Sequence, residues 1–363
     1  MRIPRSAART IAVVSVPLLL AAAAGSATAA AGPAAPAASF TTGGRLTGVA
    51  ATSATSAWAV GATTSGKTLI VHWNGTGWTQ QASPSPSSAK FGNDLSAVAV
   101  TSASNAWAVG SYGTASSKTM ILRWNGKNWS KVPSPSPGPS SRLTGVTAAS
   151  ATSAWAVGYT STGGIGSKTL ILRWNGVAWK QVPSPSPAQS VLFDVAAASA
   201  SRAWAVGNTF SAKSQGKALL EKWTGRTWTQ VRSPAPGAGL HSVAAISGRT
   251  AWAVGFGGTG GGYLILRWNG AAWKVVASPK FSGYLPFPSG IAATSARNAW
   301  VVGSTSTGKS LIEHWAGTAW KRQPSPNGSL SAAAAVSATD AWAVGSTSGG
   351  KTLILRWNGR SWQ

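Results

Sequence analysis

Five polar residues form the one cluster of acids, bases and histidine that the sequence offers. They fall at, or close to, the same point in successive repeats of the chain: Arg45, Asp94, Arg142, Asp194 and His241. We expect them to line the mouth of a central channel. Asp194 and His241 belong to adjacent repeats, and such a pair could carry out general acid–base chemistry or orient a polar ligand. We favour a polar lining of the channel over catalysis.

The enzymatic alternative is a carbohydrate-active hydrolase or lyase that uses Asp94, Asp194 and His241. Glycoside hydrolysis usually needs two carboxylates about 5–10 Å apart. The 363 residues include five acidic residues, spread over seven repeats, which makes such a pair hard to build. We therefore assign no catalytic residue.

Lysines recur at one position of the repeat, six residues before its second tryptophan, and we call them the lysine rim. They are Lys67, Lys118, Lys168, Lys217, Lys309 and Lys351. A basic rim could capture a repetitive polyanion through many weak contacts. The alternative is a set of solvated residues at strand starts, which discourage pairing between sheet edges.

The net charge could indicate an anionic partner, but we favour a compositional origin for it. It is +26 in total and arises from the shortage of acids, because only 10% of the residues are charged. High positive charge attracts polyanions; the alternative is a compositional habit of secreted proteins from a GC-rich genome. We expect no specific nucleic-acid partner, since the interleaved aromatic and basic groove of single-strand binders is absent.

Metal and cofactor chemistry find no support in the sequence. Three histidines and no cysteine give no metal-ligand spacing. The pattern Gly255-x-Gly257-x-x-Gly260 matches a dinucleotide fingerprint by letters only, because no helix follows it. We expect no metal and no cofactor.

Seven copies of one repeat must position the candidate residues. The first tryptophans of the copies are Trp58, Trp107, Trp155, Trp204, Trp252, Trp300 and Trp342. The second are Trp73, Trp124, Trp174, Trp223, Trp268, Trp315 and Trp357, and the third follow five residues later at Trp78, Trp129, Trp179, Trp228, Trp273, Trp320 and Trp362. These account for all 21 tryptophans of the chain. A fixed period of this length indicates a solenoid, propeller or array.

Each repeat reads as four short strands. In the third copy they are residues 143–150, 154–158, 169–174 and 179–182, and Asn175-Gly176 is a strong hairpin signal. Four strands repeated radially make a propeller blade. The predicted fold is all-β, a seven-bladed β-propeller of four-stranded antiparallel blades. Its blades span roughly 45–92, 93–141, 142–190, 191–238, 239–287, 288–328 and 329–363, and Pro-rich links act as semi-rigid crossovers between them.

Several side chains that could serve a ligand fit the core of this fold better. The tryptophans could stack on sugar rings, but their strict placement favours packing between blades. A basic residue precedes each second tryptophan: His72, Arg123, Arg173, Lys222, Arg267, His314 and Arg356. We expect these residues to stack on neighbouring indoles. Glu221 and Glu313 replace a leucine that faces a gap between blades, and each needs a basic partner there.

The two ends of the chain carry separate expectations. Residues 1–29 read as a secretory signal peptide, with three arginines, an apolar stretch and the cleavage site Ala27-Thr28-Ala29. Residues 30–40 form an Ala/Pro spacer and 41–363 the propeller. We expect a secreted, extracellular monomer with no transmembrane segment after signal removal. The last copy lacks most of its fourth strand, so we expect the segment from Ser39 to Thr42 to complete it; the alternative is a fragment of a longer chain.

The motifs Ala-Trp-Ala-Val-Gly, as at 154–158, and Trp-Asn-Gly-x-x-Trp, as at 174–179, resemble those of secreted bacterial, actinobacterial-like propeller-repeat proteins. The resemblance covers Arg45 to Gln363 and implies fold and secretion. The motifs are also distantly similar to Asp-box and photosystem-assembly-factor propellers. An Asp box requires Ser and Asp where this chain has Leu172 and Trp174, so sialidase activity is not implied. We expect non-enzymatic binding of a carbohydrate or an anionic cell-surface or cell-wall polymer; the alternatives are the hydrolase or lyase above and a non-specific polyanion or nucleic-acid binder.

Overall fold

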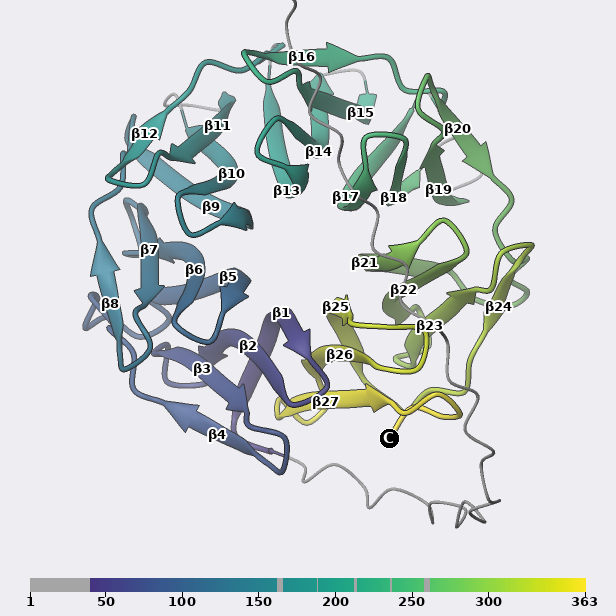
Figure 1. Ribbon diagram of the computed structural model, residues 1–363, viewed down its shortest axis with the longest axis horizontal. Helices are drawn as coiled ribbons and strands as arrows, with labels where there is room; N and C mark the ends of the chain where they lie inside the picture. Colours follow the sequence, from purple (N-terminus) through teal and green to yellow (C-terminus); the bar gives the residue numbers. More distant parts are fainter. Residues whose placement is uncertain (1–39, 162–165, 188, 212–213, 236, 258–261) are drawn as a thin grey trace, which may run out of the picture. The chain divides into compact units, whose positions relative to one another are not determined.

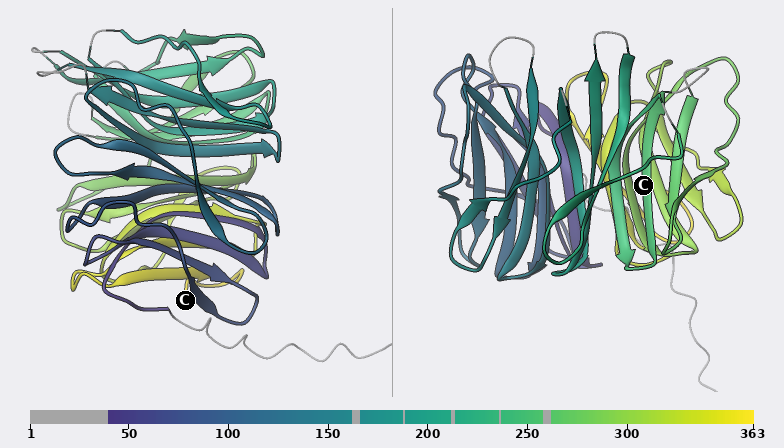
Figure 2. Two further views of the ribbon diagram at one scale, coloured as in Figure 1. Left: turned by 90° about the vertical axis from the view of Figure 1, so that its left-hand side faces the viewer. Right: turned by 90° about the horizontal axis from the view of Figure 1, so that it is seen from above.

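Seven β-sheets stand in a ring around a central channel (Figure 1). The computed structural model describes residues 40–161, 166–187, 189–211, 214–235, 237–257 and 262–363. The predicted seven-bladed β-propeller of antiparallel blades is confirmed. In Figure 2 the blades are seen from the side, and their strands run between the two faces of the ring.

Each blade runs outward from the channel in sequence order. The innermost strands are β1 (Gly44–Ser53), β5 (Asn93–Ser102), β9 (Ser140–Ser150), β13 (Ser190–Ser199), β17 (Ala238–Ser247), β21 (Pro286–Ser295) and β25 (Ser329–Ala335). The second strands are β2 (Ser56–Thr63), β6 (Asn105–Tyr112), β10 (Ser153–Ser161), β14 (Arg202–Ser211), β18 (Thr250–Gly257), β22 (Asn298–Thr305) and β26 (Ala341–Ser346).

The third strands are β3 (Thr68–Trp73), β7 (Lys118–Trp124), β11 (Ser167–Trp174), β15 (Ser214–Trp223), β19 (Gly262–Trp268), β23 (Ser310–Trp315) and β27 (Thr352–Trp357). The outer strands are β4 (Trp78–Gln81), β8 (Trp129–Val132), β12 (Trp179–Gln181), β16 (Trp228–Val231), β20 (Trp273–Val276) and β24 (Trp320–Arg322). Antiparallel succession places the turns after the first and third strands on one face of the ring, which we call the turn face. The loops after the second strands and the links between blades lie on the opposite face, which we call the loop face.

The tryptophans hold neighbouring blades together. Trp155 of β10 is fully buried, and its ring centroid lies 4.7 Å from that of Trp223 and 5.1 Å from that of Trp228 in the next blade. The first tryptophan of every blade meets the second and third tryptophans of the following one in this way. Packing between blades, the interpretation favoured from the sequence, is therefore their role.

The Pro-rich links clamp the third strands by a contact that the sequence did not predict. The Thr169 N–H donates to Ser186 Oγ at 3.1 Å, and the Thr169 hydroxyl donates to the Pro185 carbonyl at 3.0 Å. Ser184 Oγ lies 2.9 Å from the same hydroxyl. The first and second blades repeat the arrangement at Thr68 and Thr119. The repeated Ser-Pro-Ser thus satisfies polar groups at the outer edge of the third strand.

Two separate segments complete the last blade. Trp362 forms a bridge with Trp357 of β27, and the backbones of Gln363 and Arg356 exchange two hydrogen bonds, of 2.8 and 3.0 Å. At the other end of β27, the Thr352 N–H donates to the Thr42 carbonyl at 2.9 Å, and the Thr42 N–H donates to the Thr352 hydroxyl at 3.0 Å. Residues near Thr42 therefore supply outer-edge pairing, as the sequence predicted.

Some predictions fall outside the described residues. These are the signal peptide at 1–29, the spacer as far as Ser39, and Gly260 of the rejected dinucleotide pattern. Within the described residues, the search for a helix long and apolar enough to cross a membrane finds none.

Candidate functional site

The five residues predicted at the channel mouth divide into two groups. Arg45, Asp94 and Arg142 lie on the loop face and line a hollow of about 120 Å³. The Arg45 guanidinium contacts Asp94 Oδ1 at 2.8 Å. Burial raises the pKa of Asp94, while the positive charges of Arg45 and Arg142 lower it. One carboxylate thus pairs with Arg45 and feels the charge of Arg142, and the hollow keeps a net positive charge.

The sequence did not single out Phe91, which lines the same hollow. Its side chain is 66% exposed, and its φ of 60° lies in the left-handed region that non-glycine residues rarely adopt. A Cβ at Gly66 would lie 2.1 Å from the Phe91 nitrogen, so this close approach requires glycine. An exposed ring beside two guanidiniums combines an apolar face with charged donors, which suits an acidic sugar.

Asp194 lies deeper, in the wall of the central channel, where it lines a cavity of about 230 Å³. Its carboxylate accepts hydrogen bonds from Ser242 Oγ at 2.7 Å, from Val243 N–H at 3.0 Å and from Val195 N–H at 2.8 Å. Burial raises the pKa of Asp194 to about 6, although these three hydrogen bonds lower it. Ser242 also accepts from the Ile291 N–H at 3.2 Å, so the chain of hydrogen bonds crosses three blades.

His241 lines the same channel and bonds to the following blade. Its ring donates to the Pro288 carbonyl, which raises the His241 pKa, whereas desolvation by the channel wall lowers it more. Thr144 holds the equivalent position two blades earlier and donates to the Leu192 carbonyl at 2.8 Å. The His241 ring meets Phe193 edge-on at 5.4 Å. The contacts of His241 and of Asp194 among the described residues join each to other groups, which favours a polar lining over an acid–base pair.

Replacing Ser242 with alanine is expected to raise the pKa of Asp194 above 6 by about one, because the lost hydroxyl stabilises the carboxylate. Carboxyl ¹³C NMR titration measures the change. Ser289→Ala is the control, since Ser289 lines the same channel and its hydroxyl bonds to no described residue. An unchanged Asp194 pKa in Ser242→Ala would contradict the assigned hydrogen bond.

The lysine rim is exposed to solvent. All six lysines lie at or near the start of a third strand, on the loop face, and every one of their side chains is exposed. None of the described residues forms a salt bridge with them. The lysine rim remains a predicted polyanion site, and in the structure its side chains are accessible to solvent.

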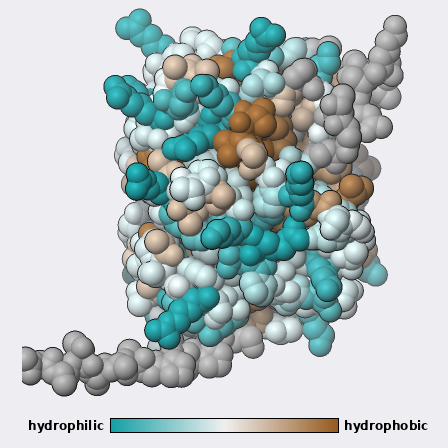
Figure 3. All heavy atoms as spheres, turned by 90° about the vertical axis from the view of Figure 1, so that its right-hand side faces the viewer, coloured by the Kyte–Doolittle hydropathy of each residue, from teal (hydrophilic) through white to brown (hydrophobic). Residues whose placement is uncertain are grey.

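None of the five acidic residues is exposed. Asp94 and Asp194 are half-buried, and Glu221, Glu313 and Asp340 are buried. Asp340 contacts Arg356 at 2.9 Å. The accessible charges are therefore cationic throughout the described surface. Figure 3 shows one side of the ring, where hydrophilic side chains are spread around one compact hydrophobic area.

Only one of the two buried glutamates has the basic partner that the sequence predicted for each. Glu313 lies 3.8 Å from Arg322. Burial raises the pKa of Glu313 to about 7, and the smaller effect of the Tyr263 hydroxyl lowers this pKa. Glu221 has no hydrogen-bond or ionic partner among the described residues, and burial raises its pKa to about 8. The prediction is wrong for Glu221, which avoids ionisation instead of finding a cation.

The basic residues that precede the second tryptophans stack on indoles, as predicted. Arg173 lies 5.1 Å from the Trp155 ring and 5.3 Å from the Trp223 ring. His314 stacks on Trp300 at 3.9 Å. The other five make similar contacts. This ring of basic residues is part of the packing between blades.

Comparison with known proteins identifies the fold but no family. No protein-family model and no curated protein matches the sequence. A solved structure of YCF48 bound to D1 peptide is similar, with 16% identity, a TM-score of 0.57, and coverage of 89% of this chain and 98% of that one. YCF48 from Cyanidioschyzon merolae has 19% identity and a TM-score of 0.54, and the match covers 86% of this chain and 96% of that one.

A GH74 xyloglucanase from Xanthomonas campestris is also similar, with 15% identity and a TM-score of 0.61. The match covers 89% of this chain and 53% of the enzyme. The YCF48 structures agree with the resemblance to photosystem-assembly-factor propellers noted from the sequence. At these identities the comparisons establish a shared propeller fold alone.

Proposed function

We propose that this protein is a secreted, non-enzymatic propeller that binds an anionic carbohydrate or cell-wall polymer on its loop face. The observation that carries the proposal is the distribution of charge. All five acidic residues are buried or half-buried, while six lysines at equivalent blade positions are exposed on one face. A polymer with a repeated negative charge can contact several such lysines at once, and linked contacts raise the avidity.

The hollow formed by Arg45, Arg142 and Phe91 supports a preference among anionic polymers. Guanidinium groups donate paired hydrogen bonds to carboxylate or phosphate. The exposed Phe91 ring offers a flat apolar surface for a sugar ring. The lysine rim would hold the chain of the polymer, and the hollow would take one of its charged units.

Binding of the full chain to immobilised polymers tests the proposal. The panel holds an acidic polysaccharide, a phosphodiester wall polymer, duplex DNA and a neutral glycan, each at low and high salt. We expect binding to the acidic polysaccharide or the wall polymer that partly survives high salt. Binding to every polyanion that vanishes with salt would reduce the rim to a non-specific electrostatic surface.

A charge-matched pair of variants locates the binding face. Changing Lys67, Lys118 and Lys351 to glutamine removes three adjacent members of the lysine rim, and we expect affinity for the polymer to fall about tenfold or more. The control changes Lys180, Lys274 and Lys321, exposed lysines on outer strands, and removes the same charge. Equal losses in the two variants would contradict binding at the loop face.

A further inference from the structure

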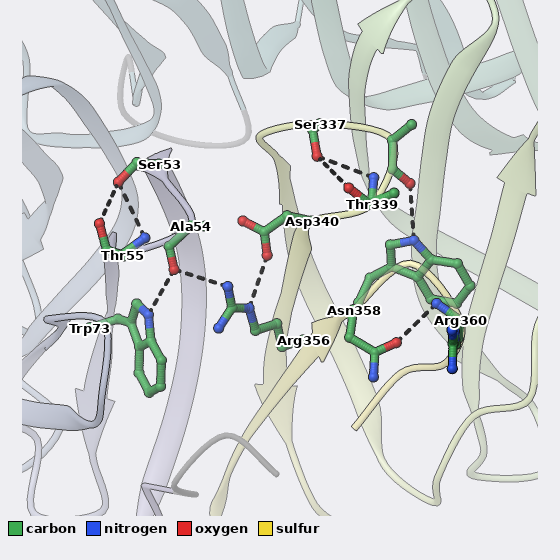
Figure 4. A network of polar contacts seen from close by, with 12 residues as sticks. Ser53, Ala54, Thr55, Trp73, Ser337, Thr339, Asp340, Arg356, Asn358 and Arg360 are labelled. Atoms are coloured by element: carbon green, nitrogen blue, oxygen red, sulfur yellow. Dashed lines mark hydrogen bonds and ion pairs between the residues drawn. The ribbon is translucent and has the colours of Figure 1, made fainter. Parts of the chain in front are cut away.

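On the turn face, the seam between the fourth and fifth blades departs from the others, which are described first. In four blades, the basic residue before the second tryptophan contacts the residue at, or just before, the start of its own second strand. In the seam between the last and first blades, Arg356 Nε donates to Asp340 Oδ1 at 2.9 Å, and Arg356 Nη2 donates to the Ala54 carbonyl at 3.0 Å (Figure 4). The cation therefore has acceptors from both blades.

Three other blades supply a neutral acceptor at the position of Asp340. Asn105 accepts from Arg123 at 3.4 Å, and Asn298 Oδ1 lies 2.7 Å from His314 Nε2. Ser56 Oγ lies 3.4 Å from His72 Nε2. The recurring design pairs a stacked base with an oxygen of its own blade.

The fourth blade replaces this acceptor with Arg202. The basic residue there is Lys222, whose ammonium lies 4.8 Å from the Trp268 ring and 5.5 Å from the Trp204 ring. The next blade adds Arg249, at a position that serine or threonine holds in five of the other six blades. The three cations line a hollow of about 450 Å³, and no acidic residue is among its lining.

The side chains of these cations form no hydrogen bond or ion pair with described residues. Of the seven seams, this one alone has a cation at all three positions. Like charges that line one hollow repel one another, and the repulsion is relieved when an anion lies between them. Arg202 and Arg249 are exposed and Lys222 is half-buried, so an anion from outside the chain can reach all three.

A glycine in the next blade accommodates the change. Gly248 stands where the six other turns have alanine, and a Cβ there would lie 1.8 Å from Arg202 Nη1. The Arg202 guanidinium thus occupies space that alanine would fill. The Gly248 carbonyl accepts from Trp268 Nε1 at 3.2 Å, as the equivalent alanine carbonyls do in other blades. The glycine and the arginine fit each other at this seam.

We propose that the hollow lined by Arg202, Lys222 and Arg249 binds a doubly charged tetrahedral oxyanion, a phosphate or sulfate group. The two guanidiniums donate hydrogen bonds in fixed planes, and the ammonium adds a third charge beside apolar indoles. The site lies on the turn face, apart from the polymer surface proposed above. Either proposal can fail without the other.

Calorimetric titration of the full chain with inorganic phosphate and with sulfate, at constant ionic strength, tests the site. We expect saturable binding of one anion per chain. Arg202→Ser introduces the residue of the first and third blades, and it should weaken binding at least tenfold. Arg297→Thr is the control, because Arg297 holds the position of Arg249 at the next seam. It removes the same charge and should leave the affinity unchanged.

Gly248→Ala tests the geometry without changing the charge. Alanine is the residue of the six other turns, so the turn should fold, while the displaced Arg202 should bind phosphate several-fold more weakly. Titrations with a phosphomonoester and a phosphodiester distinguish a free ion from a phosphate carried by a larger molecule. No binding of phosphate or sulfate, or equal losses in Arg202→Ser and Arg297→Thr, would overturn the proposal.

Discussion

Replacing Glu221 with leucine is expected to stabilise the protein by several kcal/mol at pH 9, and by much less at pH 5. The carboxyl is fully buried, and neither of its oxygens has a hydrogen-bond partner among the described residues. Four other blades have leucine at this position, Leu172 among them. Leucine therefore fits the packing, and the substitution removes a polar group from an apolar seam.

The pH dependence follows from the raised pKa of Glu221. The value is about 8 in the folded protein against 4.5 without burial. Below pH 4.5 the group is protonated in both states and imposes no ionisation cost. Between pH 4.5 and 8 the unfolded chain releases the proton while the folded one keeps it, so stability falls as the pH rises. Above pH 8 the full cost applies, at most about 5 kcal/mol.

Urea unfolding at pH 5, 7 and 9 measures the effect. Leu172→Glu is the matched reversal: it places a carboxyl at the same position of the third blade and should destabilise the protein with the same pH dependence. Glu313 and Asp194, with pKa values of about 7 and 6, leave some pH dependence in Glu221→Leu. Equal stabilisation at pH 5 and pH 9 would mean that Glu221 is ionised in the folded state with a partner.

The fold could be predicted because every blade solves the same packing problem. An equivalent of Trp155 recurs in each copy, followed by two further tryptophans that are always five residues apart, and this pattern marks both the strands and the seam. The stacking of Arg173 was predictable for the same reason. Residues that recur in every copy indicate the features that all blades share, and those features belong to the core.

The sites were less predictable because they depend on single departures from the repeat. Aligning positions brought Asp194 and His241 together, but these residues lie two or three positions further along the inner strand than Arg45, in the wall of the channel and not at its mouth. Arg202 was overlooked, although serine, asparagine, threonine or aspartate holds its position in the other blades. A column-by-column comparison of the copies would have exposed that substitution. The isolation of Glu221 required the structure, because a sequence does not show which neighbours a buried side chain lacks.

Removing the segment that pairs with β27 is expected to cost several kcal/mol and to open the ring. A chain that starts at Arg45 loses the two hydrogen bonds between Thr42 and Thr352 and the bond from Gly44 N–H to the Gly350 carbonyl, at 2.9 Å. It also loses Phe40, which packs against the core between the last and first blades. Each hydrogen bond contributes about 0.5–1.5 kcal/mol and the aromatic side chain about 1.5–3 kcal/mol.

Because of where these contacts lie, losing them should destabilise the protein by more than the sum of their separate free energies. Most seams are bridged by a covalent link between blades, but the seam between β27 and β1 joins the two ends of the chain. Without the segment, half of the outer edge of β27 has unpaired backbone groups, which invite pairing with a second molecule. We therefore expect a lower unfolding temperature together with aggregation, measured by calorimetry and light scattering.

Two controls separate ring closure from the loss of local bonds. A chain that starts at Phe40 keeps every described contact of the segment and should match the full chain. Thr352→Val and Thr169→Val each remove one hydroxyl at the same position of a third strand. The partners of Thr169 lie 15 to 17 residues away in the chain, whereas Thr42 and Thr352 are 310 residues apart. If closure matters, Thr352→Val is the more destabilising change; equal effects would mean that the terminal segment adds only its own hydrogen bonds.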